Sequence, residues 1–361
     1  TFSTQSDTEV VLKAFEYYEM HALNKFNGQF AIIMWDKINH ELIVARDRYG
    51  IRPLYILNHK NKFFFSSEMK AFDAIKDYNR DFNIENLYEH AVLWNTLGDK
   101  TVFQNIRSLP AGTFEIFKSG KSHRCYRYYE IGESKKEYNN NFDEAKEEFI
   151  NLLNDSVKIR LRSDVPVGNY LSGGIDSSVI TYLTKKNNNN IFKTFSISFK
   201  DKSYDETDYQ NQMVSKIQSD HYNILIDYNS ISENIIDAAY HFERPLFRTA
   251  PVPLYMLSEK VRQNDLKVVL TGEAADEILF GYDSFKELLM LNNWNKNPEL
   301  TNESLKKLYP HLDYYKDSNM YGFIKMYYEN FLSSYNNNLL SLNIRAYNNK
   351  ILANYFNKDF N

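Results

Sequence analysis

The chain has 361 residues, of which 43% are hydrophobic and 25% charged, and its formal net charge is −4. This length is enough for two domains that each have a hydrophobic core. The small negative charge gives no basic surface for nucleic acid or an anionic membrane, and we expect neither as a partner. A single cysteine, Cys125, excludes an internal disulfide and suits a reducing cytoplasm.

The first predicted helix begins at the N-terminal end of the chain. Ser6-Asp7-Thr8-Glu9 precedes the apolar Val10-Val11-Leu12, a pattern typical of a capped helix N-terminus. Asp7 is therefore a candidate cap. Farther along, Arg46-Asp47-Arg48 follows a predicted strand and indicates a salt-bridged turn.

A strand, a turn rich in small residues and a helix are predicted over residues 165–183. Val165 to Leu171 is an apolar run, and the helical pattern begins at Ser177. Between them, Ser172-Gly173-Gly174 exposes backbone N–H groups at a helix N-terminus, where phosphate binds readily. Asp176 puts an acid into this anion site, which suits a divalent cation shared with phosphate oxygens. The alternative is an ordinary helix start with a glycine turn and a polar cap.

A second turn of the same kind follows the predicted strand Lys267 to Leu270. It runs from Thr271 to Glu277 and leads into an apolar helix start. Residues 192–199 and 222–226 are predicted strands between the two turns, so this region alternates strand and helix. Ligands of parallel sheets bind beyond the carboxyl ends of the strands. We therefore expect both turns at one edge of one sheet, closing a single site.

The sequences of these turns, SGGIDSS and TGEAADEILFGY, resemble the synthetase domain of glutamine-dependent asparagine synthetases, which belong to the ATP pyrophosphatase family. Upstream blocks resemble the later part of that family's glutaminase domain, a class II glutamine amidotransferase; they are Phe26 to Ala31, Ala45 to Tyr55, Ser66 to Ala71, Ser108 to Gly112 and Arg127 to Tyr129. Because several blocks occur in the family's order, the signal is specific.

The resemblance implies an α/β fold in two domains. Residues 1–130 are expected to form the C-terminal part of an N-terminal-nucleophile glutaminase domain with antiparallel sheets. Residues 131–361 are expected to form a parallel-sheet ATP-pyrophosphatase domain that is incomplete at its C-terminus. Thr1 to Glu9 resembles an internal segment of the glutaminase domain, so we expect a piece of a longer protein that lacks the N-terminal cysteine nucleophile. Cys125 has no free α-amine and is expected to be structural.

The implied reaction is ATP-dependent, glutamine-hydrolysing amidation of the aspartate side chain to asparagine. It passes through a β-aspartyl-adenylate and releases AMP and pyrophosphate. Asp176 and Asp276 are expected to bind Mg²⁺, one from each turn, and Glu273 is expected to assist proton removal from the attacking amine. Residues expected to hold ATP and pyrophosphate are Leu171, Ser172, Gly173, Gly174, Asp176, Ser177, Ser178, Ile197, Thr271 and Gly272.

For the glutaminase half, the resemblance implies that Asp7 binds the α-ammonium group of glutamine, since a buried cation needs a carboxylate partner. Helix capping remains the alternative for this residue. The small-molecule substrates are expected to be glutamine, aspartate and ATP. The resemblance also implies a cytoplasmic location and a homodimer.

Two departures from the family pattern bear on the acceptor. Ala274 stands where glycine is usual, and alanine fits there unless the backbone φ is positive. Arg248, within Glu243 to Pro251, is expected either to bind a substrate carboxylate through both guanidinium nitrogens or to form a structural ion pair. After about residue 290 the sequence predicts helices and shows no clear match.

Three functions remain open at this point. The first is a glutamine-hydrolysing asparagine synthetase. The second is an asparagine-synthetase-like amidotransferase or β-lactam-synthetase-like ligase that adenylates a different carboxylate. The third is a non-catalytic scaffold or nucleotide sensor, which the retained acids Asp7, Asp176, Glu273 and Asp276 argue against.

Overall fold

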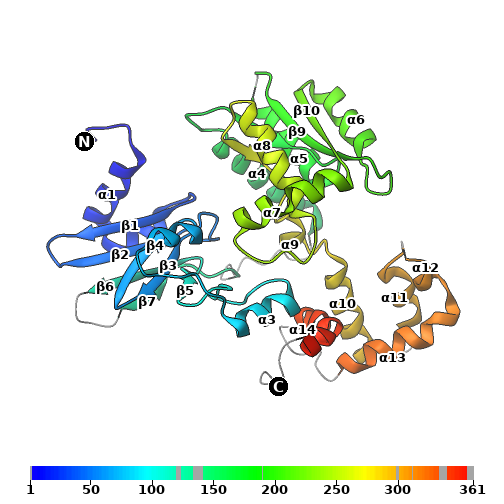
Figure 1. Cartoon of the computed structure of the whole chain (residues 1–361). Helices are drawn as coiled ribbons and strands as arrows, with labels where there is room; N and C mark the ends of the chain where they lie inside the picture. The colour runs from blue at the N-terminus through cyan, green and yellow to red at the C-terminus, as the bar shows by residue number, and fades with distance from the viewer. Residues whose placement is uncertain are drawn as a thin grey trace. The chain divides into compact units, whose positions relative to one another are not determined.

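The computed structural model describes residues 2–118, 123–132, 141–188, 190–297, 301–310, 312–332 and 340–355. The chain divides into two compact units (Figure 1): Thr1–Glu137 together with Leu352–Asn361, and Tyr138–Ile351. Within the described ranges, no helix is long and apolar enough to cross a membrane.

The first unit contains two antiparallel sheets, as predicted. One has the order β1-β2-β6-β7 and the other the order β4-β3-β5. Their strands are β1 Ala31–Asp36, β2 Glu41–Arg46, β3 Tyr55–His59, β4 Lys62–Ser66, β5 Ile106–Ser108, β6 Thr113–Lys118 and β7 Arg124–Arg127. The helices of this unit are α1 Asp7–Tyr18, η1 Glu19–His21, α2 Ala22–Lys25, η2 Met69–Ala74 and α3 Ile84–Leu93.

Strand alternation gives the four-stranded sheet two buried faces. Ala45 and Phe114 pack with Phe15 of α1 and Leu23 of α2, while Val44 on the opposite face packs with residues of the second sheet. Glu115 of β6, 2% exposed, is held on that second face by Arg107 of β5. The guanidinium Nη1 and Nη2 lie 2.7 and 2.6 Å from the two carboxylate oxygens. This bidentate pair compensates a buried charge and joins the two sheets.

Among the described residues, the turn at Arg46-Asp47-Arg48 is held by hydrogen bonds and contains no ion pair, so the prediction of a salt-bridged turn is wrong. Asp47 is 1% exposed, and its carboxylate accepts hydrogen bonds from the backbone N–H groups of Tyr49, Ile51 and Arg52. The Arg46 guanidinium donates to backbone carbonyls, among them Arg52 O at 2.8 Å. These side chains satisfy the polar backbone groups of a tight buried turn.

The second unit begins with a parallel sheet of order β10-β9-β8-β11, which confirms the predicted α/β arrangement. The strands are β8 Val167–Tyr170, β9 Lys193–Phe199, β10 Asp220–Ile226 and β11 Val268–Leu270. The helices that accompany this sheet are α4 Phe142–Arg160, α5 Ile175–Asn187, α6 Thr207–Ile217, α7 Tyr228–Phe242, α8 Pro251–Gln263 and α9 Ala275–Leu279.

The two faces of the parallel sheet differ in chemistry. Phe195 of β9 packs with Leu257 and Val261 of α8, forming an apolar layer. The α5 side is polar: Asn169 of β8, fully buried, donates through Nδ2 to Thr184 Oγ1 of α5 at 3.1 Å. Hydrogen-bonded polar groups are tolerated in such a core, and they fix a strand against its helix more directionally than apolar contacts do.

Two predicted boundaries need correction. The strand predicted over Val165 to Leu171 is confined to Val167–Tyr170. The helix predicted to begin at Ser177 begins at Ile175, with Gly174 as its N-cap. Asp176 consequently lies in the first turn of α5, where a carboxylate is favoured by the helix dipole.

The rest of the second unit is helical, as predicted for the described residues after 290. The helices are α10 Asp283–Lys296, α11 Thr301–Leu308, α12 Asp313–Lys316, η4 Ser318–Met320, α13 Tyr321–Leu332 and α14 Leu340–Asn349, followed by η5 Lys350–Tyr355. Met290, Leu291, Leu305, Tyr328 and Ile344 belong to their common core. The segments 298–300, 311, 333–339 and 356–361, part of the same prediction, lie outside the described residues.

A buried carboxyl lies within this helical core. Glu287 of α10 accepts hydrogen bonds from Tyr328 Oη at 2.5 Å and Tyr309 Oη at 2.9 Å, and Tyr315 Oη lies 3.1 Å from Tyr328 Oη. Burial raises the pKa of the Glu287 carboxyl above its usual 4.5, and the two tyrosine hydrogen bonds act in the opposite direction. The folded state therefore retains this proton to a higher pH than the unfolded chain does.

This raised pKa predicts a pH dependence of stability. The contribution of the neutral carboxyl is fully present below the usual 4.5 and is lost as the pH rises through the folded-state pKa. Glu287→Gln should therefore gain thermal stability relative to wild type as the pH rises from 4.5 through the folded-state pKa of Glu287. Differential scanning calorimetry across this range tests it, with Glu329→Gln, at an exposed position of α13, as the matched control. Parallel pH profiles for wild type and Glu287→Gln would contradict the prediction.

Candidate functional site

The first turn forms an open helix N-terminus. Gly173 has φ +92°, a conformation that side chains other than glycine rarely adopt, and the Gly174 N-cap gives no side-chain hydrogen bond to α5. The first N–H groups of α5 are thus available to a ligand. Backbone N–H groups and the positive end of the helix dipole together favour an anion here.

The hydroxyl groups of the turn shape the loop. Ser177 Oγ accepts from the Ser172 N–H at 3.1 Å and donates to Gly174 O at 3.2 Å, and it lies 2.9 Å from Ser172 Oγ. Ser172 Oγ in turn accepts from the Gly174 N–H at 3.2 Å. The N–H of Ser178 donates to Gly174 O within the first turn of the helix. Phosphate binding by this loop would therefore depend mainly on backbone N–H groups.

The second turn passes directly over the start of α5. A Cβ atom added to Gly272 would lie 2.7 Å from the backbone N of Ser177 and 2.8 Å from the Cβ of Asp176. These distances are too short for any side chain, so glycine is required for the contact. β11 pairs with β8 in parallel, which brings both turns to the same sheet edge, as predicted.

The two turns enclose a pocket of about 150 Å³. Its lining includes four carboxylates and, among the described lining residues, no lysine, arginine or histidine. The lining consists of Tyr170, Ser172, Asp176, Ser177, Thr271, Gly272, Glu273, Ala274, Ala275, Asp276, Glu277 and Tyr282. In the described part of the chain, no group of three or more His, Cys, Asp or Glu side chains is arranged to hold a metal ion.

Ala274 has the left-handed backbone conformation, with φ 75° and ψ 0°. Because this φ is positive, alanine does not fit here as well as the glycine that is usual at this position. A left-handed alanine brings its Cβ close to the following carbonyl, and such strain is typical of ligand sites. The strained residue lies between Glu273 and Asp276, two of the predicted site residues.

Three other predicted residues of this unit, Leu171, Ile197 and Arg248, do not line the pocket. Leu171 is 1% exposed; its N–H donates to Phe195 O at 2.9 Å and its carbonyl accepts from the Ser196 hydroxyl. Ile197 lies in the C-terminal half of β9, and its carbonyl accepts a hydrogen bond from Gln210 Nε2. Arg248 lies in the segment between α7 and α8 and does not line this pocket.

Two tyrosines of the lining were not predicted. Tyr282 Oη donates to Glu277 Oε1 at 2.8 Å, and this hydrogen bond is the main cause that raises the pKa of Tyr282 to about 12. Tyr170 Oη lies 3.1 Å from Ser258 Oγ of α8, and burial raises its pKa. Tyr170 immediately precedes the Leu171-Ser172 segment, so its place at the end of a strand that leads into a ligand loop was the signal available in the sequence.

A separate pocket in the first unit, of about 770 Å³, contains Asp7. Asp7 is the first residue of α1, and the helix is capped by Ser6, whose hydroxyl accepts from the Thr8 N–H at 3.2 Å. The capping alternative for Asp7 is therefore wrong. Arg52, Ser67, Glu68 and Gln29 line the same pocket, which gives it polar groups of both charges.

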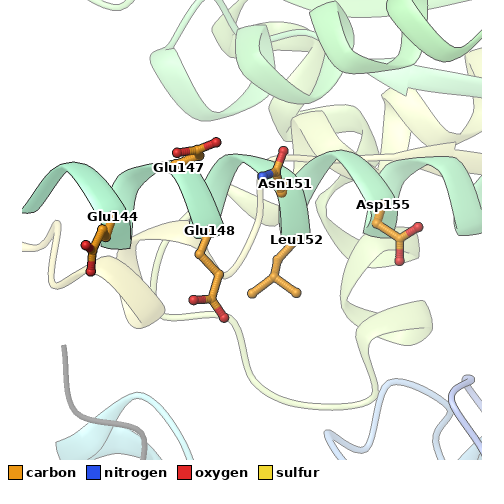
Figure 2. A pocket seen from close by; sticks show the side chains of 6 residues that line it. All are labelled: Glu144, Glu147, Glu148, Asn151, Leu152 and Asp155. Carbon is orange, nitrogen blue, oxygen red and sulfur yellow. The ribbon is translucent and has the colours of Figure 1, made fainter.

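A further hollow of about 420 Å³ runs along the exposed side of α4 (Figure 2). Its lining comes from this one helix and consists of Glu144, Glu147, Glu148, Asn151, Leu152 and Asp155. Glu144 and Glu148 project from the same side of the helix. The N-terminus of α4 is capped by the Asn141 side chain, so this hollow lacks both the open helix N-terminus of α5 and a cationic side chain among its described lining residues.

Comparison with known families identifies both halves of the chain. Residues 148–349, more than half of the chain, match the asparagine synthase family. The chain belongs to that family. Residues 1–129 match the glutamine amidotransferase domain. The asparagine synthase match includes both turns of the pocket, and the amidotransferase match includes Asp7.

Curated relatives carry the same family names. The chain is 30% identical to asparagine synthetase [glutamine-hydrolyzing] 1 of Bacillus subtilis over 86% of its length and 48% of the relative's. It is 35% identical to putative asparagine synthetase [glutamine-hydrolyzing] 2 of Methanocaldococcus jannaschii over 77% of its length and 54% of the relative's. It thus spans about half the length of these relatives. Amidase chyE of Penicillium rubens is 30% identical over 80% of this chain and 45% of the relative.

Among solved structures, the NH3-dependent NAD synthetase of Campylobacter jejuni is 14% identical, with a TM-score of 0.30, over 57% of this chain and 96% of that one.

The strain at Ala274 predicts that Ala274→Gly stabilises the second unit by about 1 kcal/mol, because glycine adopts positive φ without a Cβ conflict. The thermal midpoint should rise by roughly 2–4 °C in a unit of this size. Calorimetry measures this change directly. Ala275→Gly is the matched control, since Ala275 is helical and its replacement should lower stability instead. An unchanged or lower midpoint for Ala274→Gly would argue against the left-handed conformation.

Proposed function

We propose that the full-length protein is a glutamine-hydrolysing asparagine synthetase. The observation that carries the proposal is the meeting of two acid-bearing turns at the open N-terminus of α5. Family membership and the amidotransferase match support the same function. Residues 1–130 would belong to the glutaminase domain and residues 131–361 to the synthetase domain.

The chemistry requires activation of a carboxylate, which is a poor electrophile. An oxygen of the aspartate side chain attacks the α-phosphorus of ATP, and the bond to the pyrophosphate oxygen breaks. Ammonia then attacks the carbonyl carbon of the β-aspartyl-adenylate, and AMP leaves. The N–H groups at the start of α5 would hold the pyrophosphate, and Glu273 would take the proton of the attacking amine.

The charge of the pocket supports a divalent cation. Four carboxylates without a basic side chain among the described lining residues would repel a triphosphate. Asp176 and Asp276, one from each turn, would hold Mg²⁺, which supplies the missing positive charge when bound. Because the described side chains do not form a complete ligand set, we propose that the phosphate oxygens complete the metal site.

We predict that Asp176→Asn lowers ATP–pyrophosphate exchange by about 100-fold or more, since it removes a metal ligand and a charge. Glutamine hydrolysis by the same full-length variant should stay within about twofold of wild type, as expected for a site in another domain. Asp237→Asn, at an exposed position of α7, is the control. Equal loss of both activities would count against separate sites.

The same exchange assay identifies the acceptor. A second candidate function is adenylation of a different carboxylate. It is supported by the position of Arg248 outside the pocket, and one similar relative, amidase chyE, is not named as an asparagine synthetase. Exchange that depends on aspartate supports asparagine synthesis. If the rate of ATP–pyrophosphate exchange does not depend on aspartate, the second candidate function would replace asparagine synthesis.

In the glutaminase half, Asp7 would bind the α-ammonium group of glutamine. Its place in the pocket of the first unit that Arg52, Ser67 and Glu68 also line supports this role. Asp7→Asn in the full-length protein should raise the KM for glutamine by about 10- to 100-fold, the usual cost of losing a charged hydrogen bond. Ammonia-dependent synthesis should remain. Glu16→Gln, exposed on α1, is the control, and an unchanged KM in Asp7→Asn would remove Asp7 from the site.

The family resemblance further supports a cytoplasmic homodimer whose ligands are glutamine, aspartate and ATP. Sedimentation velocity of the full-length protein tests the dimer.

A further inference from the structure

Gln210 of α6 is a buried polar residue behind the nucleotide pocket. It is 1% exposed, although glutamine is usually a surface residue. Its side-chain amide contacts three of the four strands of the parallel sheet or the loops that follow them. Nε2 donates to Ser172 O at 3.2 Å, after β8, and to Ile197 O at 2.9 Å, in β9. Oε1 accepts from Asn223 Nδ2 of β10 at 3.3 Å.

The hydrogen bond to the Ser172 carbonyl orients the loop 172–174, which we call the phosphate loop because of its proposed role. A trans peptide is planar, so the Ser172 carbonyl and the Gly173 N–H point in opposite directions. Because Gln210 holds the carbonyl on the α6 side, the Gly173 N–H is directed away from α6. The loop cannot turn over without breaking this hydrogen bond and leaving a buried donor unsatisfied.

The second contact links the phosphate loop to the strand beside it. Ser172 and Ile197 accept from the two hydrogens of one amide group, so a single side chain joins the loop after β8 to β9, beyond the backbone contact of Leu171 with Phe195. Helix α6 also packs closely on Gly173: a Cβ added there would lie 3.1 Å from Tyr209 Cβ and 3.4 Å from Gln210 Cγ. The positive φ of Gly173 and the position of Gln210 therefore depend on each other.

We propose that Gln210 is a positioning residue for the nucleotide, holding the loop at Ser172 and strand β9 at Ile197 in the geometry that receives the phosphates and the nucleoside. This inference rests on the proposed function, because it concerns the same ATP site. Gln210 itself does not line the pocket and acts through the two backbone carbonyls.

The test uses full-length protein and measures ATP affinity by titration calorimetry with Mg²⁺ present. Gln210→Met keeps the length of the side chain and removes both donors. Its dissociation constant for ATP should rise about 10- to 100-fold, as is usual when a residue that orients binding groups is lost. The KM for glutamine should be unchanged, which a general loss of stability would not produce. Gln212→Met, at an exposed position two residues farther along α6, is the matched control and should bind ATP as wild type does.

Asn223→Asp provides a second variant that does not alter the core, because Asn223 is exposed. A carboxylate there can only accept, so the Gln210 amide would turn its NH2 group toward it and away from the two carbonyls. ATP affinity should fall in this variant as well, by about 3- to 10-fold.

The outcomes separate the two hypotheses. Wild-type protein that does not bind ATP would overturn the proposed function, and this inference with it. The inference alone would be overturned if the wild-type protein binds ATP and both Gln210→Met and Asn223→Asp bind ATP with dissociation constants within about twofold of the wild-type value. If Gln210→Met does not fold, the affinity of Asn223→Asp decides.

Discussion

The close contact between Gly272 and the first turn of α5 is the constraint on which the candidate site depends. It brings one turn across the backbone of the other, with less than 3 Å available for any Cβ at residue 272. Four carboxylates then line one small pocket beside an open helix N-terminus. Such a concentration of negative charge is unfavourable by itself and becomes favourable only with a cation. The geometry thus suits the proposed ligand, in which phosphate is accompanied by a metal ion.

The surroundings of this contact are unusually polar for a sheet core. One face of the parallel sheet packs on α8 through Phe195, while the other is held by hydrogen bonds such as that of Asn169 with Thr184. Gln210 extends this polar layer toward the sheet edge, where its amide donates hydrogen bonds to the carbonyls of Ser172 and Ile197. Directional bonds hold backbone groups at defined angles, which apolar packing does not do. A site that binds through backbone N–H groups benefits from that difference.

Strain is concentrated at the same place. Gly173 and Ala274 both have positive φ, one in each turn, and only the first is a glycine. The left-handed alanine lies between Glu273 and Asp276, so the conformational strain is located where the proposed chemistry would occur. The usual helix cap is also absent from α5, which leaves donors for a ligand at the expense of local stability.

The sequence alone determined the alternation of strand and helix, the two turns and the family, because apolar periodicity and short motifs are local properties. It also placed the turns that lead to Asp176 and Asp276 after two strands of one sheet, and the parallel pairing of β8 with β11 confirms that the two strands belong to one sheet. Helix and strand ends were less well predicted: α5 begins at Ile175 because glycine at 174 serves as the cap. Only the tertiary structure decided the sign of φ at Ala274, the use of the Ser177 hydroxyl within its own loop, and the hydrogen bonds of Gln210. The Gln210 hydrogen bonds join groups distant in sequence that meet through sheet pairing and helix packing. The other two are local conformations that residue types alone do not specify.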